Sequence, residues 1–330
     1  MNVFELTKRL IAIQSISGGE NDVALFLKEH LSRAGFDVEL QEVEDNRPNV
    51  YARRGDPLVV MSSHTDTVPP YIDFSEDEEF IYGRGACDAK GTIAAMVKAA
   101  EALIEAGATD LGLLFVVGEE AGSPGARAAN TIANRSRYLI NGEPTESRIA
   151  LGSKGALRCH IKAEGRAAHS AYPEMGESAI DKLLEVLGDL RRTSFPEDPL
   201  LGATTMNIGT IKGGVAANVI PAEAEAELMF RVVTGTGSLM QIIEEAVWGR
   251  ARIEYTFACD PVFMESVEGF ETAVVSFTTD IPLLTGWGKP LLFGPGSILD
   301  AHTAHEKIAK AELARAVAAY AGIAGRLLKS

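Results

Sequence analysis

The chain has 330 residues, of which 46% are hydrophobic and 23% charged, and its formal net charge is −15 at pH 7. This length predicts two domains, or one domain with a large insertion, and the apolar content is enough for a packed core. The acidic balance argues against nucleic acid and against an anionic membrane as partners, because both select a basic surface. Apolar runs such as 111–117 are too short to cross a bilayer.

The three cysteines, Cys87, Cys159 and Cys259, are scattered and form no CxxC pair. They predict neither a disulfide framework nor a thiolate metal site, and they suit a reducing compartment. Because the first ten residues contain no signal-peptide h-region, we expect a cytoplasmic protein. Any metal would therefore have to be held by His, Asp and Glu side chains.

Helical and strand patterns alternate over the first 150 residues. Helices are expected near 3–13, 20–34, 92–107 and 125–134, and strands near 37–43, 49–54, 57–63, 79–82, 111–120 and 138–146. Strands that alternate with helices predict an α/β domain, in which a mostly parallel sheet carries helices on both faces.

The pattern changes near residue 153. Over 153–261 the expected order is strand, helix, two strands, helix and strand, which is the order of a ferredoxin-like α+β unit. A helix near 270–279, a strand at 291–293 and a closing helix near 306–328 then return to the first pattern. We therefore expect one domain formed by 1–152 and 262–330, with residues 153–261 inserted in it.

The segment SSHTDTVPP (62–70) ends a buried apolar strand with a histidine and an aspartate two residues apart. In an extended strand, residues i and i+2 point to the same face. Taken alone, His64 and Asp66 are compatible with a satisfied polar pair at a strand end. The alternative is a metal-ligating imidazole whose other N–H donates to a carboxylate.

Other junctions between strands and loops carry the same kinds of side chain. They are Asp88 in a glycine-rich turn, the neighbours Glu119 and Glu120, Glu143, and His302 after GPGSILDA. The carboxyl ends of the strands in an open parallel sheet surround one crevice, where we expect these residues to converge. Two histidines and three carboxylates suit a pair of Zn²⁺ ions that share the aspartate. Because Glu119 and Glu120 are adjacent, one could bind metal while the other acts as a general base.

These motifs resemble the co-catalytic zinc deacylase and peptidase family that includes acetylornithine deacetylase, succinyl-diaminopimelate desuccinylase, aminoacylase and glutamate carboxypeptidase. The resemblance covers nearly the whole chain in collinear order. It is carried by SSHTDTVP, YGRGACDAKG, VVGEEAGSPGA, NGEPT, GRAAHSAYPEMGESAI, GGVAANVIPAEAEAELMFR and FGPGSILDAHTAHE. TTMNIGTIKGG and the GPGS ending are most similar to the acetylornithine deacetylase branch. The resemblance implies a zinc exopeptidase-like fold.

The resemblance also implies two metal sites that share one carboxylate. One Zn²⁺ would be held by His64, Asp88 and Glu143, and the other by Asp88, Glu120 and His302. Co²⁺ is expected to support activity as well. Asp66 would orient His64, Glu119 would be the general base, and the peptide bond after Asp88 would be cis.

The inserted domain would supply His169, Asn218 and Arg231. In the family this domain pairs about a two-fold axis, so the resemblance implies a homodimer in which His169 stabilises the oxyanion in the partner's active site. Arg231, together with the backbone of Gly294 and Gly296, would hold the substrate carboxylate, for which a guanidinium fork is well shaped. Taken alone, Arg231 is a charge on the face of a strand.

Three features depart from the family pattern. His305 lies three residues after His302 and could compete with it for metal. The segment PPYIDFSEDEEFIYGRG is shorter and more acidic than usual, and Asp280 stands where the most similar branch carries glutamate. Both of these segments would shape the substrate pocket, so the identity of the substrate stays open.

We therefore expect a metal-dependent amide hydrolase that acts on a small N-acyl amino acid, first of all by N-acetylornithine-type deacetylation in arginine biosynthesis. The alternatives are a desuccinylase, a dipeptidase, and a hydrolase that frees lysine or ornithine from a carrier protein. An acidic carrier would be repelled by a chain of charge −15. A non-catalytic metal-binding protein is a further alternative, but such a protein has no need of a base such as Glu119.

Overall fold

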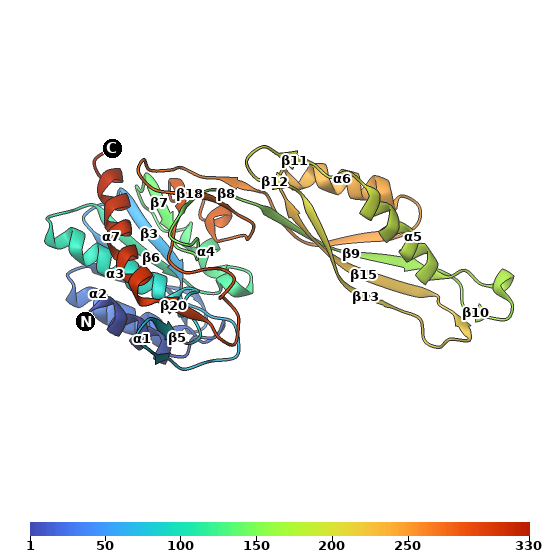
Figure 1. The fold of residues 1–330 in the computed structure, drawn as a ribbon, viewed down its shortest axis with the longest axis horizontal. Coiled ribbons are helices and arrows are strands. Elements are labelled where there is room, and N and C mark those ends of the chain that lie inside the picture. The colour runs from blue at the N-terminus through green and yellow to red at the C-terminus, as the bar shows by residue number, and fades with distance from the viewer. The chain divides into compact units, whose positions relative to one another are not determined.

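The computed structural model describes all 330 residues, which divide into two compact units. Unit 1 comprises Met1–Leu151, Met264–Ala273 and Thr279–Ser330, and unit 2 comprises Gly152–Phe263 and Val274–Thr278. Both segments of unit 2 are therefore inserted in the sequence of unit 1 (Figure 1).

Unit 1 is built on one mixed β-sheet, whose strands run in the order β1-β2-β6-β3-β7-β19-β8. Their bounds in chain order are β1 (Asp37–Glu44), β2 (Arg47–Arg54), β3 (Val59–His64), β6 (Leu111–Val116), β7 (Tyr138–Asn141), β8 (Ile149–Ser153) and β19 (Lys289–Leu292). The four central strands, β6 to β19, are parallel to one another, and the flanking pairs are antiparallel. The short strands β17 (Val262–Phe263) and β18 (Thr272–Val275) pair with β8.

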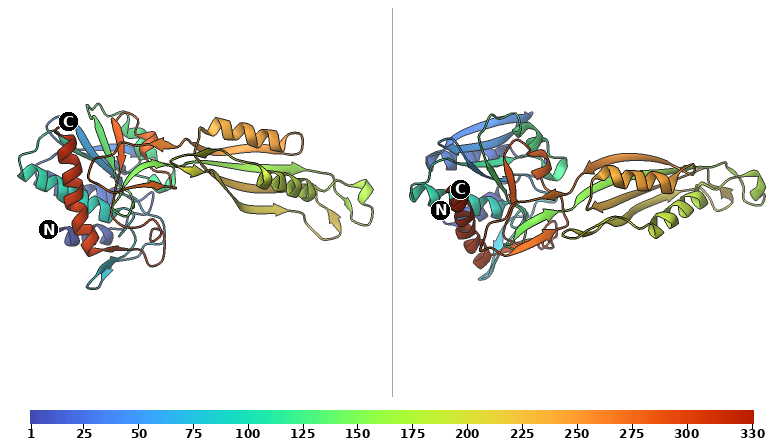
Figure 2. Two further views of the ribbon diagram at one scale, coloured as in Figure 1. Left: turned by 45° about the horizontal axis from the view of Figure 1, so that its top comes forward. Right: turned by 90° about the horizontal axis from the view of Figure 1, so that it is seen from above.

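Helices cover both faces of this sheet, as the sequence predicts. One face packs against α1 (Val3–Ala12), α2 (Asn21–Arg33), α3 (Lys90–Glu105) and α7 (Lys310–Leu327). In the views of Figure 2, α7 in red lies beside α3 in teal. On β3, Met61 belongs to this core whereas its neighbour Val60 belongs to the core on the other face. The continuous apolar run of this strand therefore reflects burial on both sides.

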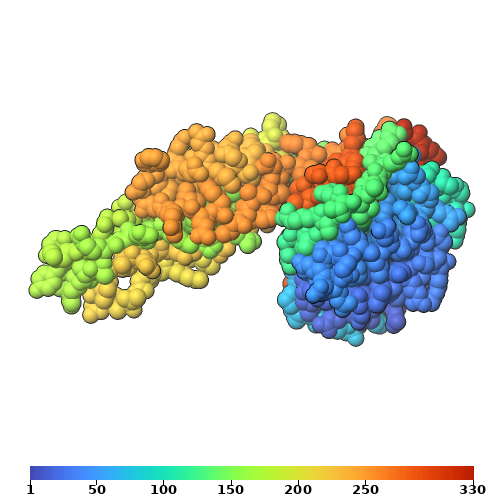
Figure 3. Space-filling view, turned by 180° about the vertical axis from the view of Figure 1, so that it is seen from behind, coloured from blue at the N-terminus to red at the C-terminus, as the bar shows by residue number.

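The second face is covered by α4 (Pro124–Ala129) and by the segment around the 3₁₀ turn η3 (Ile281–Leu283). Trp287 packs edge-on against Tyr51 with ring centroids 5.3 Å apart. In Figure 3, residues near 130 in green run beside residues near 280 in orange-red, where Asn130 bonds to the Leu283 carbonyl. This contact fixes the segment that contains Asp280 to the C-terminal end of α4.

The central strands end at one edge of the sheet. In the parallel register, His64 on β3 lies opposite Val116 on β6, and Ser62 lies opposite Asn141 on β7. The turns that follow these strands carry Glu119, Glu120 and Glu143. Three of the expected strand exits therefore meet at the same edge, as parallel topology requires.

Unit 2 contains a ferredoxin-like α+β fold, which the order of its elements predicts. The elements are β9 (Gly155–Glu164), α5 (Ala179–Arg192), β13 (Thr205–Gly213), β15 (Glu223–Val232), α6 (Thr236–Val247) and β16 (Arg252–Cys259). The sheet order is β13-β15-β9-β16, with every neighbouring pair antiparallel. On β15 the residues alternate, with Leu228 and Phe230 buried in the core formed with the two helices.

The remaining elements are short. They are β4 (Ser75–Glu76), β5 (Phe80–Tyr82), η1 (Glu119–Ala121), β10 (Ala168–His169), η2 (Pro173–Met175), β11 (Glu197–Asp198), β12 (Gly202–Ala203), β14 (Val219–Ile220) and β20 (Lys307–Ala309). The prediction of a helix near 270–279 is wrong, because the β-branched residues of this segment form strand β18 instead. No helix combines the length and the apolar composition that a membrane span requires.

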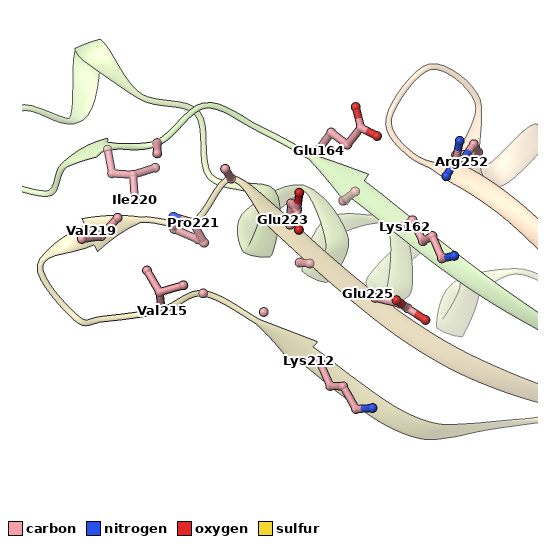
Figure 4. A pocket seen from close by; sticks show the side chains of 16 residues that line it. Lys162, Glu164, Lys212, Val215, Val219, Ile220, Pro221, Glu223, Glu225 and Arg252 are labelled. Carbon is pink, nitrogen blue, oxygen red and sulfur yellow. The ribbon is translucent and has the colours of Figure 1, made fainter.

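A hollow of about 630 Å³ lies on unit 2 beside the open face of its sheet (Figure 4). Its charged lining consists of Lys162, Lys212, Arg252, Glu164, Glu223 and Glu225. These three basic and three acidic side chains balance, and the hollow contains no histidine or cysteine. It therefore lacks the donors expected of a site for a borderline metal ion.

Leu27 and Leu25 provide a matched pair of tests on α2. Leu27 is fully buried, whereas Leu25 is 48% exposed. We expect Leu27→Ala to lower the free energy of unfolding by about 2–5 kcal/mol, because it leaves a cavity, and Leu25→Ala to lower it by less than about 1 kcal/mol. In a Trp248→Phe background the buried Trp287 is the only tryptophan, so its fluorescence during urea denaturation reports on unit 1. Equal effects would contradict the packing of α2.

Candidate active site

Unit 1 brings the five predicted metal ligands together as two groups that share Asp88. One group is His64, Asp88 and Glu143, the other is Asp88, Glu120 and His302, and within each group the ligand atoms lie within 4.8 Å of one another. His64 Nε2 lies 3.0 Å from Asp88 Oδ1, and His302 Nε2 lies 3.2 Å from Asp88 Oδ2. Each oxygen of the shared carboxylate thus faces a different histidine.

Different elements deliver these side chains. His64 is the last residue of β3, Glu120 belongs to η1, and Glu143 follows β7 by two residues. Asp88 precedes α3, and its peptide bond to Ala89 is cis, as the resemblance implies. His302 has a positive φ of 63°, in a turn between β19 and β20.

The donor set fits a pair of divalent cations. Imidazole nitrogens and carboxylate oxygens are ligands that Zn²⁺ and similar ions accept. Glu143 is 5% exposed, and its Oε1 atom is buried without a hydrogen-bond partner. A buried carboxylate oxygen that lacks a partner is costly, and a cation would remove that cost.

The ionisation of the site reflects its excess of acidic groups. Burial raises the pKa of Glu143 well above its ordinary value. Hydrogen bonds to Asp88 and Glu120 raise the pKa of His302 to about 10. Burial opposes protonation of His64, but the charge of Glu143 and the bonds to nearby carboxylates raise its pKa well above the ordinary value. Without a cation, the histidines therefore retain protons, which metal binding would displace.

Asp66 does more than contact His64. The carboxylate of Asp66 lies 3.4 Å from His64 Nδ1, while its backbone carbonyl lies closer, at 3.0 Å. The same carboxylate accepts hydrogen bonds from the backbone N–H groups of Glu119, at 3.0 Å, and Glu120, at 3.2 Å, and from the Ser17 hydroxyl, at 2.7 Å. Asp66 therefore also fixes the turn that presents both glutamates.

Glu119 lies beside the two ligand groups without belonging to either. It forms a third cluster with His64 and Glu120. Desolvation, followed by the charge of Asp280, raises the pKa of Glu119 well above its ordinary value. The turn depends on Gly118, whose φ is 75° and where a Cβ would press against Pro124. A carboxylate of raised pKa beside a metal site is suited to accept a proton.

His305 takes no part in these clusters. Its backbone N–H donates to the Thr303 hydroxyl, and the ligand group contains His302 instead. Asp280, in the segment expected to shape the pocket, is buried, and one of its oxygens lacks a hydrogen-bond partner. Burial raises the pKa of Asp280 to about 6.

Sequence reasoning did not single out Arg84 and Glu306, which form a buried ion pair at 2.6 Å behind Asp88. Both lie within quoted motifs, GRGACDAKG and DAHTAHE. The available signal was a charged residue enclosed by glycines in the turn that carries the predicted ligand Asp88.

The predicted substrate-binding glycines already have hydrogen-bond acceptors. The N–H of Gly294 donates to the Thr145 hydroxyl, and the N–H of Gly296 donates to the Glu312 carboxylate, each at 3.0 Å. A substrate carboxylate would have to displace these acceptors. Of the three residues predicted to hold the substrate carboxylate, Arg231 is the one whose side chain carries a positive charge.

Unit 2 brings two of its three predicted residues together. His169 on β10 pairs with Val219 on β14, and the Ser170 N–H donates to the Asn218 carbonyl at 3.0 Å. Arg231 lies elsewhere, as the penultimate residue of β15, a strand that is labelled in Figure 1. At the usual rise per residue, Glu223 at the start of this strand and Arg231 near its end lie about 26 Å apart.

Comparison with known proteins extends these observations. Residues 151–248 match the family described as a peptidase dimerisation domain, and residues 49–154 match peptidase family M28. A peptidase M20 domain-containing protein of Schizosaccharomyces pombe is 40% identical over 325 residues, which cover 94% of this chain and 81% of the relative. A probable carboxypeptidase of Emericella nidulans is 37% identical over 368 residues, which cover 96% of this chain and 87% of the relative. The crystal structure of a tripeptidase from Staphylococcus aureus shares the fold, with a TM-score of 0.84 at 20% identity, over 100% of this chain and 98% of that chain.

The fold, the paired ligand groups and these relatives define a metal-dependent hydrolase of amide bonds. More narrowly, the chain belongs to the M20 family of metallopeptidases. The expected membership of a metallopeptidase and deacylase family is confirmed at this level. The relatives give no support to the acetylornithine deacetylase branch, because they are named as peptidases and carboxypeptidases.

Metal content tests the ligand groups. We expect protein saturated with Zn²⁺ to hold about two equivalents per chain, because two groups share Asp88. His302→Ala should retain about one equivalent, whereas the matched variant His305→Ala should retain both. Elemental analysis after equilibrium dialysis measures all three. One equivalent in a fully active wild-type enzyme would contradict the shared-carboxylate arrangement, and loss of metal in His305→Ala would reassign the ligand.

Proposed function

We propose that the protein is a di-metal peptidase that releases the C-terminal amino acid from dipeptides or other short peptides. The observation that carries this proposal is the pair of ligand groups meeting at Asp88 with Glu119 beside them. The peptidase and carboxypeptidase names of the relatives support a peptide substrate. The expected N-acetylornithine-type deacetylation has no such support, so it becomes the competing arm of the assay.

Each residue then has a role in the proposed reaction. The two groups would hold the cations, which in such sites polarise the scissile carbonyl and lower the pKa of water. Glu119 would accept the proton of the attacking water and transfer it to the nitrogen of the leaving amino acid. The raised pKa of Glu119 supports this role, because the carboxyl group must hold the proton between the two transfers.

A free substrate carboxylate would be recognised by Arg231. Guanidinium groups bind carboxylates through two parallel hydrogen bonds. Arg231 is half-buried, and burial lowers its pKa, with Arg158 as the neighbouring cation. A bound anion would therefore relieve the repulsion between the two arginines.

The positions of His169 and Arg231 support a shared active site in a homodimer. Arg231 lies about 26 Å along β15 from Glu223. His169 pairs with Val219, which precedes Glu223 in the chain. An extended dipeptide spans only about 7 Å. One small substrate therefore cannot touch both residues of the same unit 2. Two chains could supply one residue each, with the histidine of one protomer stabilising the oxyanion in its partner.

The cysteines and the donor set favour a location and a metal. The three cysteines are free, which supports a reducing compartment such as the cytoplasm. The mixture of imidazole and carboxylate donors supports Zn²⁺, and Co²⁺ accepts the same ligands.

A panel of substrates tests the reaction. With Zn²⁺ or Co²⁺ added, we expect dipeptides and tripeptides with a free C-terminus to be cleaved faster than N-acetylornithine or N-succinyl-diaminopimelate. C-terminal amides should lose about 10- to 150-fold in kcat/KM, because a charge-assisted hydrogen bond contributes about 1.5–3 kcal/mol. Release of free amino acids measures both comparisons. Preference for N-acetylornithine would overturn the peptidase proposal.

Glu119→Gln is the catalytic control for this assay. It should lower turnover by roughly 10²- to 10⁴-fold while both metal ions remain bound. Glu120→Gln should instead lose metal. The opposite pattern in metal content would mean that the two glutamates exchange roles.

Subunit mixing tests the role of His169. We expect His169→Ala and Glu119→Gln homodimers to be nearly inactive, since an oxyanion donor contributes roughly 10²- to 10³-fold in rate. When the two are dissociated and reassociated in equal amounts, about half the dimers are mixed, and about a quarter of all sites should regain activity. If His169 served its own chain, every site would keep one defect. Verified exchange without recovery would therefore refute a shared site.

A further inference from the structure

Glu306 is a buried carboxylate whose two oxygens both accept hydrogen bonds. Its Oε1 atom accepts hydrogen bonds from three backbone N–H groups, those of Gly85 at 2.9 Å, Cys87 at 3.2 Å and Asp88 at 3.0 Å. Its Oε2 atom accepts from Arg84 at 2.6 Å. Although it is an acid beside the metal site, Glu306 belongs to none of the candidate ligand groups.

These contacts join the two segments that supply Asp88 and His302. The Glu306 carbonyl accepts the N–H of Gly83 at 3.0 Å, and the next residue begins β20, which pairs with β5. Arg84 also donates to the carbonyl of Thr303, the residue after His302, at 3.2 Å. More than 200 residues separate these segments in the sequence, with Glu306 lying 218 positions after Asp88.

We propose that Glu306 is a positioning residue that sets Asp88 relative to His302, so that both can bind the same metal ion. The proposal rests on the di-metal function proposed above. Three N–H groups of one turn converge on a single oxygen, so a shift of that turn would break several hydrogen bonds together. The Asp88 carboxylate is therefore fixed through its own backbone, while the His302 turn is fixed through Arg84 and the Glu306 backbone.

A carboxylate is the only side chain that meets these requirements. Every group around Glu306 is a donor, and an ionised carboxylate accepts at both oxygens. Glutamine would point an NH₂ group either at the backbone N–H groups or at Arg84. It would also leave the buried guanidinium without its counter-charge, which is strongly unfavourable.

The simpler explanation is that Glu306 only stabilises the fold. A purely structural ion pair would lower the free energy of unfolding but leave the metal affinity of the folded protein unchanged. Glu101 on α3 offers a control, because it is another hydrogen-bonded carboxylate of unit 1, partly buried and bonded to His30 at 2.9 Å and to Lys98. Neither of its partners is a metal ligand or a neighbour of one.

The experiment compares Glu306→Gln with Glu101→Gln. Zn²⁺ affinity at both sites is measured by competition with a chelator, Co²⁺ absorption spectra report ligand geometry, and urea denaturation reports stability. We expect Glu306→Gln to weaken binding of one ion by about 10- to 100-fold, the usual cost of losing a group that orients metal ligands, and to alter the Co²⁺ spectrum. Glu101→Gln should reduce stability only.

Further outcomes distinguish a failure of the positioning role from a failure of the di-metal function. If Glu306→Gln does not fold, Glu306→Asp replaces it, because aspartate keeps the charge for Arg84 but is too short to reach the turn as well. Wild-type affinities and spectra in the folded variant would overturn the positioning role. Wild-type protein that binds no Zn²⁺ would instead overturn the di-metal function itself.

Discussion

Asp88 presents one carboxylate oxygen to His64 at 3.0 Å and the other to His302 at 3.2 Å. This sharing concentrates acidic groups in a largely buried place, where they repel one another unless cations or protons compensate. The surrounding turns therefore need anchors that do not depend on the cations. Two accessory carboxylates provide them, since Asp66 accepts the N–H groups of the Glu119 turn and Glu306 accepts those of the Asp88 turn.

The sequence predicts the strands whose own burial pattern is regular, either continuous as in β3 and β6 or alternating as in β15. Strands β3 and β6 are buried at every position, so their apolar runs are visible without any knowledge of their neighbours. Strand β18 is different, because only Val275 of its residues is buried. Its pairing with β8 depends on chain more than 100 residues away, and a local pattern cannot reveal it.

The same distinction applies to the site. His64 and Glu143 follow apolar strands, so parallel topology alone brings them to one edge. Arg84 and Glu306 are single charged residues that lie 222 positions apart, and only the folded chain shows that they are partners. Similarly, the sequence gives no sign that the N–H groups of Gly294 and Gly296 are already satisfied by Thr145 and Glu312.

In the proposed reaction the two units would have separate roles in catalysis and in substrate recognition. The groups that would activate and cleave an amide all lie in unit 1. In the proposed reaction they would act on the amide group itself and would not select the side chains on either side of it. Recognition of a free carboxylate would fall to unit 2, where Arg231 lies near the end of β15 and His169 pairs with β14, which precedes the start of that strand. Because β15 is the inner strand between β13 and β9, its length cannot adjust to a substrate. In the proposed homodimer this sheet would therefore act as a spacer, which would favour small substrates bound between two copies of the chain over long ones bound by a single copy.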